Sequence, residues 1–186
     1  MLHPGELVGL TRKDLVFPRD VGYDMDCLFV HVRNPKTARF ARRQRGRIDD
    51  AGLILVFESL FGSLRLNENS FVGSISLFRK QWNAIMSALG IPHRQSIRGA
   101  TPGVLRGSGA TYWYACAENI PLIAWRGRWA RTRTLEFYLQ EVSAQLLLHE
   151  LPATSRAKIE FLSNCSLAVL CHHLDLAEQH FVSGSG

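Results

Sequence analysis

The apolar residues of this chain recur mainly at helical spacing. Segments 53–61 and 76–89 carry apolar side chains three and four positions apart, and Gly62 and Gly90 follow them as stop signals. Asp49 and Asp50 precede the first of these helices as candidate caps. The same spacing predicts further helices over 5–15, 104–117, 120–125, 132–149 and 154–177.

One segment has the composition of a strand instead. Residues 28–33 read Leu-Phe-Val-His-Val-Arg, and Asn34-Pro35 then forms a turn signal. The basic stretch after this turn is a candidate returning strand. The pattern therefore predicts a mainly α fold with a small antiparallel β-sheet (α+β), in a chain of 186 residues that is long enough for a real core.

Composition narrows the class of protein. A hydrophobic content of 46% excludes a wholly disordered chain. No run reaches the roughly 20 apolar residues of a membrane span, and the first residues lack the features of a signal peptide. Four scattered cysteines without a CxxC pair are typical of reduced thiols. We expect a soluble intracellular protein with no membrane contact.

Positive charge is concentrated in two segments. The net charge is +6, from 22 Lys and Arg against 16 Asp and Glu. The first segment holds seven basic residues and no acidic one: Arg33, Lys36, Arg39, Arg42, Arg43, Arg45 and Arg47. The second surrounds Trp129 and holds Arg126, Arg128, Arg131 and Arg133. Such segments suit a polyanion such as DNA, or they are solvated loops that keep the protein soluble.

Four short motifs follow one another in a fixed order. They are Leu2-His3-Pro4-Gly5-Glu6-Leu7, then Thr101-Pro102-Gly103-Val104-Leu105-Arg106, then Gly127-Arg128-Trp129, and finally Tyr138, nine residues after Trp129. This order and spacing resemble the catalytic box of the tyrosine recombinases, which break and rejoin DNA. The resemblance covers most of the chain up to about residue 149, and the ordered set is more specific than any member.

The resemblance implies a role for each motif position. His3 stands where the family has its first arginine, Glu6 matches the acidic residue of that motif, and Lys36 falls at the hairpin lysine. Gly103 and Arg106 occupy the positions of His-x-x-Arg, and Trp129 occupies the His/Trp position. The catalytic set implied is Tyr138, Arg106, Lys36, Trp129, His3 and Glu6.

These residue types suit the chemistry of phosphodiester transfer. Arg106 would hold the phosphate oxygens with a planar fork of donors, and the phenol of Tyr138 would attack phosphorus. Lys36 would protonate the departing sugar oxygen. Trp129 would donate its indole N–H, and Glu6 would orient the cations around it. Taken singly, each has a structural alternative; an aromatic such as Tyr138 is most often a packing residue.

Further implications concern partners and organisation. The partner would be double-stranded DNA, bound by a set of arginines, with several protomers assembled on it. The protein would be intracellular and located with the DNA, which in a eukaryote means the nucleus. Neither a metal nor a nucleotide cofactor is required. The expected DNA-binding residues are Arg33, Arg39, Arg42, Arg43, Arg126, Arg128 and Arg131. We expect a catalytic domain over 1–150, without the helices that precede the first motif in the family, and a helical extension with a flexible tail over 151–186.

Two departures from the family pattern keep alternatives open. Imidazole at His3 lacks the guanidinium fork, and Gly103 offers no base, so we expect a crippled recombinase. A DNA-binding remnant without strand transfer is the second hypothesis, and a helical protein-interaction domain is the third. A C-terminal group of thiols and imidazoles fits no standard zinc pattern, so we expect no metal site; its members are Cys165, Cys171, His172, His173 and His180.

Overall fold

The structure is a computed structural model, and it describes residues 2–22, 25–33, 45–94, 96, 99–129, 131–136, 139 and 141–183, with the side chains of 141–145 and 175–183 left aside. In chain order the helices are α1 (Pro4–Val8), α2 (Pro18–Val21), α3 (Ala51–Phe61), α4 (Ile75–Leu89), α5 (Val104–Ala117), α6 (Ile120–Gly127), α7 (Thr132–Glu136), α8 (Glu141–Glu150) and α9 (Ala153–Ser183). A 3-10 turn, η1, spans Arg12–Asp14. The prediction of a mainly helical α+β fold is confirmed.

A small sheet organises the N-terminal half. Over the described residues it has three strands, β1 (Leu15–Val16), β2 (Leu28–His31) and β3 (Arg45–Ile48), in the order β1-β2-β3 and antiparallel throughout. In the register, Leu15 pairs with Val30 and Leu28 pairs with Ile48. The strand predicted over 28–33 and its basic returning strand are therefore present, and the returning strand begins at Arg45.

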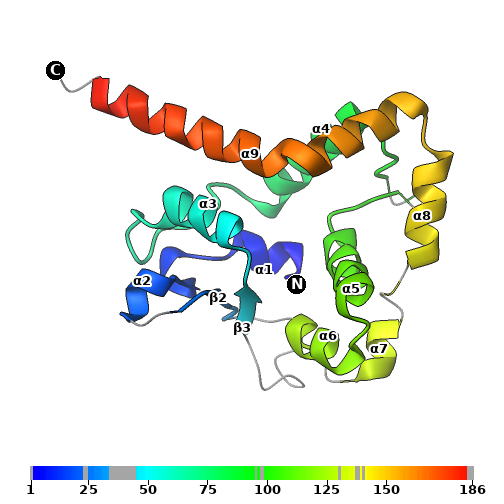
Figure 1. Ribbon diagram of the computed structural model, residues 1–186, viewed down its shortest axis with the longest axis horizontal. Helices are drawn as coiled ribbons and strands as arrows, with labels where there is room; N and C mark the ends of the chain where they lie inside the picture. The colour runs from blue at the N-terminus through cyan, green and yellow to red at the C-terminus, as the bar shows by residue number, and fades with distance from the viewer. Residues whose placement is uncertain are drawn as a thin grey trace.

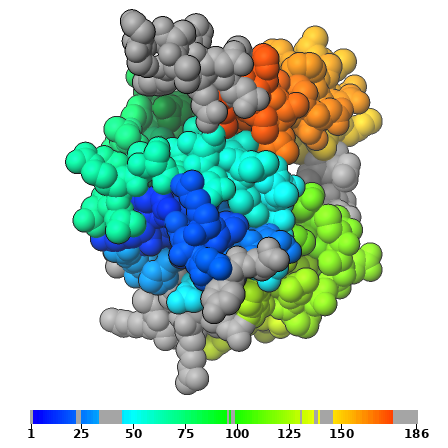
Figure 2. Space-filling model, turned by 60° about the vertical axis from the view of Figure 1, so that its left-hand side comes forward, coloured from blue at the N-terminus to red at the C-terminus, as the bar shows by residue number. Residues whose placement is uncertain are grey.

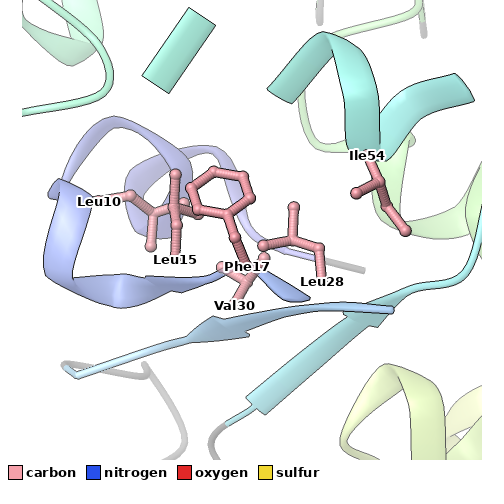
Figure 3. Close-up of a cluster of buried hydrophobic side chains, with 6 residues drawn as sticks. All are labelled: Leu10, Leu15, Phe17, Leu28, Val30 and Ile54. Atoms are coloured by element: carbon pink, nitrogen blue, oxygen red, sulfur yellow. The ribbon is translucent and has the colours of Figure 1, made fainter. Parts of the chain in front are cut away.

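The face of the sheet that carries Leu28 and Val30 packs against the first hydrophobic core. Leu28 and Val30 are buried there, while His31 is exposed, because successive side chains of a strand point to opposite faces. Figure 3 shows these two residues meeting the ring of Phe17, with Ile54 reaching down from α3. This cluster, with the partly buried Ile48, joins the sheet to α3 and positions the end of β3 that leads into that helix.

Arg12 interrupts the single helix that was predicted over 5–15. Its guanidinium donates to the carbonyl of Leu15 at 2.8 Å and to Asp20 at 2.7 Å, and it lies 4.7 Å from the ring centroid of Phe17. These bonds satisfy a buried cation only if η1, β1 and α2 turn around it. The prediction of one helix was wrong because local periodicity does not report such a tertiary ion pair.

The helices that follow begin and end close to the predicted positions. The Asp50 carboxylate accepts a hydrogen bond from the Leu53 N–H at 2.8 Å and starts α3. Ser74 does the same for Leu77 at 3.2 Å, so α4 begins just before the predicted Ser76. Gly90 ends α4 with φ of 72°, a left-handed conformation that glycine adopts without strain.

A second core lies between α5, α6 and α7. Its buried members are Ala110, Ile123, Ala124 and Leu135. Asn119 breaks the helical run as expected, because its side chain caps α6 by accepting the Leu122 N–H at 3.0 Å. The helix predicted over 132–149 is instead divided into α7 and α8.

The long helix α9 returns to the first half of the molecule. Figure 1 shows it running across α4 and α3, and in Figure 2 the part of α9 drawn in orange lies above α3, drawn in cyan. A methyl group at Gly52 of α3 would lie 2.7 Å from Leu167 of α9, so glycine permits this close crossing. No helix in the described part of the chain is long and apolar enough to span a bilayer.

Acid should destabilise the fold through Asp14 and Asp20. Burial by itself raises the pKa of both carboxyls, but hydrogen bonds from Thr11 to Asp14, and from Arg12 to Asp20, outweigh it and lower both pKa values from the usual 3.8. The unfolded chain therefore takes up these protons first as pH falls. We expect the free energy of unfolding, measured with urea, to decline from about pH 4.5 downward.

The variant Asp20→Asn serves as the comparison in that experiment. It should be less stable at neutral pH than the unchanged chain. It should also lose less stability between pH 5 and 3, because one of the two carboxyls whose pKa is lowered by folding is gone. A free energy of unfolding that stays constant through this range would contradict the assignment.

Candidate functional site

Arg106 is held in a fixed orientation near the start of α5. Its Nη2 donates to the backbone carbonyl of Gly127 at 2.7 Å, and its guanidinium carbon lies 4.7 Å from the ring centroid of Trp129. A guanidinium over an indole face gains a cation–π attraction of about 0.5–2 kcal/mol. The carbonyl and the indole together set both the plane and the direction of this cation.

The turn after α6 brings Trp129 to that place. Helix α6 ends at Gly127, Arg128 adopts a left-handed conformation with φ of 60°, and the Trp129 N–H donates back to Ala124 at 2.9 Å. A methyl group at Gly127 would overlap the six-membered ring of Trp129. The absence of a side chain at Gly127 therefore allows the indole to fold onto the helix end.

Arg128 turns inward to a carboxylate from the opposite end of the chain. Its Nη2 lies 2.6 Å from Oε2 of Glu6, and the two side chains are 3% and 6% exposed. They are 122 positions apart in the sequence. Removing one partner of such a buried pair typically costs about 3–5 kcal/mol, because the other charge is left without compensation.

His3 joins the same group through the backbone. Its N–H donates to Oε2 of Glu6 at 2.8 Å, and its ring Nδ1 accepts from the N–H of Gly5 at 3.3 Å. Because Nδ1 is an acceptor, the neutral ring carries its proton on Nε2. His3 therefore serves as the cap of α1 and offers at most one N–H, whereas an arginine offers a fork.

A second carboxylate gathers the neighbouring arginines. Arg126 Nη1 lies 2.6 Å from Oδ2 of Asp49, Arg47 pairs with the other oxygen, and the Arg126 guanidinium lies 4.1 Å from the ring centroid of Trp113. Burial alone raises the pKa of Asp49, but the hydrogen bonds and charges of Arg126 and Arg47 outweigh this and lower it. Asp49 thus ties β3 to α6.

The structure brings part of the predicted catalytic set together. Arg106 contacts Trp129, Glu6 contacts the backbone of His3, and Arg128 links Glu6 to the turn that holds the other two. Lys36 and Tyr138 lie outside the described residues. Leu135 and Leu139, on either side of Tyr138 in the sequence, pack in the same cluster as Trp129.

The predicted DNA-binding arginines divide into different environments. Arg131 is exposed, and Arg33 remains 41% exposed although it pairs with Asp14. Arg126 and Arg128 do not form an open basic surface, since their side chains are 16% and 3% exposed and face Asp49 and Glu6. Arg39, Arg42 and Arg43 lie outside the described residues.

Sequence analysis does not find the roles of three contributors to this site. It gives Asp49 as a candidate helix cap and Arg128 as a DNA-binding arginine, and it does not single out Trp113 within the helix over 104–117. Local sequence gives no signal for Arg128, because the left-handed residue at a helix end is usually glycine, and here it is Arg128 and not the preceding Gly127. The ion pairs themselves have no signal in a single sequence, because their partners are distant along the chain.

Comparisons with protein-family models, with curated proteins and with solved structures find no match to this chain. In the part of the chain that the structure describes, no three His, Cys, Asp or Glu side chains gather closely enough to hold a metal ion.

Replacing Gly127 by alanine should disrupt the support of Arg106. The added methyl overlaps the ring of Trp129, so the indole must leave its place. We expect a loss of about 1–3 kcal/mol in the free energy of unfolding, together with a red shift of tryptophan emission as Trp129 meets water. Gly103→Ala is the matched control, because its methyl would meet only Thr101 Oγ1 at 3.6 Å. Equal stability of both variants would refute this packing.

Proposed function

We propose that this chain is a tyrosine-recombinase-like domain that binds double-stranded DNA and holds one backbone phosphate at Arg106. The observation that carries the proposal is the orientation of that guanidinium by the Gly127 carbonyl and the Trp129 ring. Recognition of a phosphate by an arginine depends on the direction of its planar fork, and a fixed plane loses less entropy on binding.

The convergence of distant motifs supports the same proposal. Three of the segments that carry the family resemblance are 2–7, 101–106 and 127–129, and contacts within the described residues link all three. Packing alone would not require the turn after α6 to orient the cationic Arg106, or that turn to be tied to Glu6 by a buried ion pair. A phosphate site requires donors and positive charge in one neighbourhood.

The proposed reaction needs two groups beyond the phosphate clamp. The oxygen of Tyr138 attacks phosphorus and forms a phosphotyrosyl bond, while the bond from phosphorus to the sugar oxygen breaks. Lys36 supplies the proton for that departing oxygen. A second sugar hydroxyl then attacks the phosphotyrosine and releases the phenol, so no metal or nucleotide is consumed.

A DNA-binding remnant without strand transfer is the second candidate. It is favoured by the environments of His3 and Gly103. The ring of His3 uses Nδ1 to cap α1, and Gly103 at the N-cap of α5 has no side chain to donate or accept a proton. Loss of one charge-stabilising donor typically lowers a rate about 100- to 1,000-fold, so the two candidates differ in rate more than in DNA affinity.

A nicked duplex substrate tests strand transfer. A pool of random-sequence duplexes with a nick at one fixed position traps the covalent intermediate wherever cleavage falls close to the nick, because the short strand between them diffuses away. We expect a protein–DNA adduct that survives denaturing electrophoresis. The adduct should disappear in Tyr138→Phe, which removes only the attacking oxygen, and fall at least about 100-fold in Arg106→Gln.

The pattern of results separates the two candidates. An adduct that persists in Tyr138→Phe assigns the chemistry to another residue and refutes the proposed nucleophile. No adduct from the unchanged chain, together with retained DNA binding, selects the remnant.

Salt dependence tests the phosphate contact itself. A gel-shift titration at several salt concentrations should give a logarithmic affinity that falls linearly with the logarithm of salt, with a slope of about −0.9 for each phosphate neutralised. Arg106→Gln should weaken binding to all sequences and reduce the slope by about 1. Arg65→Gln, a change in a side chain that is 88% exposed and paired with Glu68, is the matched loss of charge and should leave the slope nearly unchanged. Binding that is independent of salt would favour the interaction-domain hypothesis.

A further inference from the structure

We propose that Arg128 is a positioning residue, which acts on the phosphate only through Arg106. In this proposal the buried Glu6–Arg128 ion pair anchors the turn 127–129, and that turn orients the Arg106 guanidinium. Its relevance to DNA rests on the proposed function, whereas the coupling between the pair and Arg106 does not.

A continuous chain of contacts carries the inference. The N–H of His3 and the guanidinium of Arg128 both donate to Oε2 of Glu6, at 2.8 and 2.6 Å. Arg128 stands between two residues that hold Arg106, namely Gly127 through its carbonyl and Trp129 through its ring. A shift of the Arg128 backbone therefore moves both supports of Arg106 together.

The backbone at Arg128 provides a second observation. Arg128 has φ of 60°, and within the described residues it shares a positive φ only with Glu118 among residues other than glycine. A left-handed conformation is unfavourable for a residue with a Cβ, so the surroundings must hold it in place. The ion pair with Glu6 is an interaction on the same residue that is strong enough to do so.

The burial of Arg128 shows how it acts. Its side chain is 3% exposed and faces the Glu6 carboxylate, so a phosphate on the surface does not reach it without breaking the pair. Arg106 is half-buried and contacts the turn 127–129 through the Gly127 carbonyl and the Trp129 ring. The two arginines therefore have different tasks, one structural and one in contact with the proposed ligand.

The test uses the full-length chain and the Nε–H resonance of Arg106 in nitrogen-15 NMR, assigned with Arg106→Lys. Stacking on an indole shifts this resonance by the ring current of Trp129, so Trp129→Leu defines the unstacked position. Arg128→Gly is the main variant, because glycine adopts the left-handed conformation without strain, so a shift of Arg106 reports the loss of the side chain that pairs with Glu6 rather than a change in backbone strain. We expect the Arg106 resonance to move at least halfway to the unstacked position in Arg128→Gly.

Two further variants complete the set. Glu6→Gln removes the charge from the other side of the pair and should move the resonance in the same direction. Arg128→Lys keeps a charge within reach of Glu6 and should restore a position closer to that of the unchanged chain. A resonance that stays in place in folded Arg128→Gly or in folded Glu6→Gln overturns the proposal. The proposal is also overturned if Arg128→Gly does not fold while Glu6→Gln folds and keeps the Arg106 resonance at its stacked position.

Binding of a 30-base-pair DNA duplex separates this proposal from the proposed function. Arg128→Gly and Arg106→Gln should each weaken binding about tenfold, and the double variant should be no weaker than Arg106→Gln alone, because both changes remove the same oriented cation. If the two losses of affinity multiply in the double variant, Arg128 acts independently of Arg106, and the coupling is overturned. If the unchanged chain binds no duplex, the proposed function fails, while the NMR result still decides the role of Arg128.

Discussion

The arrangement of this molecule depends on one buried ion pair between its two halves. Glu6 belongs to the first helix, Arg128 ends the sixth, and their side chains are almost fully enclosed where they meet. A charge removed from water is tolerated only with a well-placed opposite charge and further hydrogen bonds. The pair therefore specifies how the α5–α7 core sits against α1, and with it where Arg106 and Trp129 lie.

A related arrangement occurs at Asp49, whose carboxylate pairs with one arginine from each basic segment. Arg126 and Arg47 converge on this residue, and the indole of Trp113 covers the Arg126 guanidinium. The basic segments are thus not uniform stretches of surface charge. Among the members that the structure describes, Arg126 and Arg128 face carboxylates and are largely buried, whereas Arg131 is exposed. Net charge alone does not separate these two groups.

The resulting site is an oriented cation with structural support, rather than a complete set of catalytic donors. Arg106 has a fixed plane, yet Gly103 contributes no side chain, and the ring of His3 is engaged in capping α1. This combination is coherent for binding a phosphate and weaker for accelerating its transfer. It explains why the proposed recombinase-like domain and the DNA-binding remnant share one site and differ in the expected rate of strand transfer.

Local pattern determined much of the fold. The strand at 28–31, the caps at Asp50 and Asn119, and the glycine that ends α4 were predictable, because each depends on residues within a few positions. The order and spacing of the motifs also singled out Arg106, Trp129 and Glu6 before their contacts were known. Only the tertiary structure decided that Arg12 divides the first segment into short elements, that Arg128 faces Glu6, and that Gly127 lies under Trp129. The Glu6–Arg128 pair joins residues 122 positions apart, and the other two features depend on how the chain turns around a side chain. A buried charge takes whichever partner the packing brings to it, which periodicity and composition do not encode.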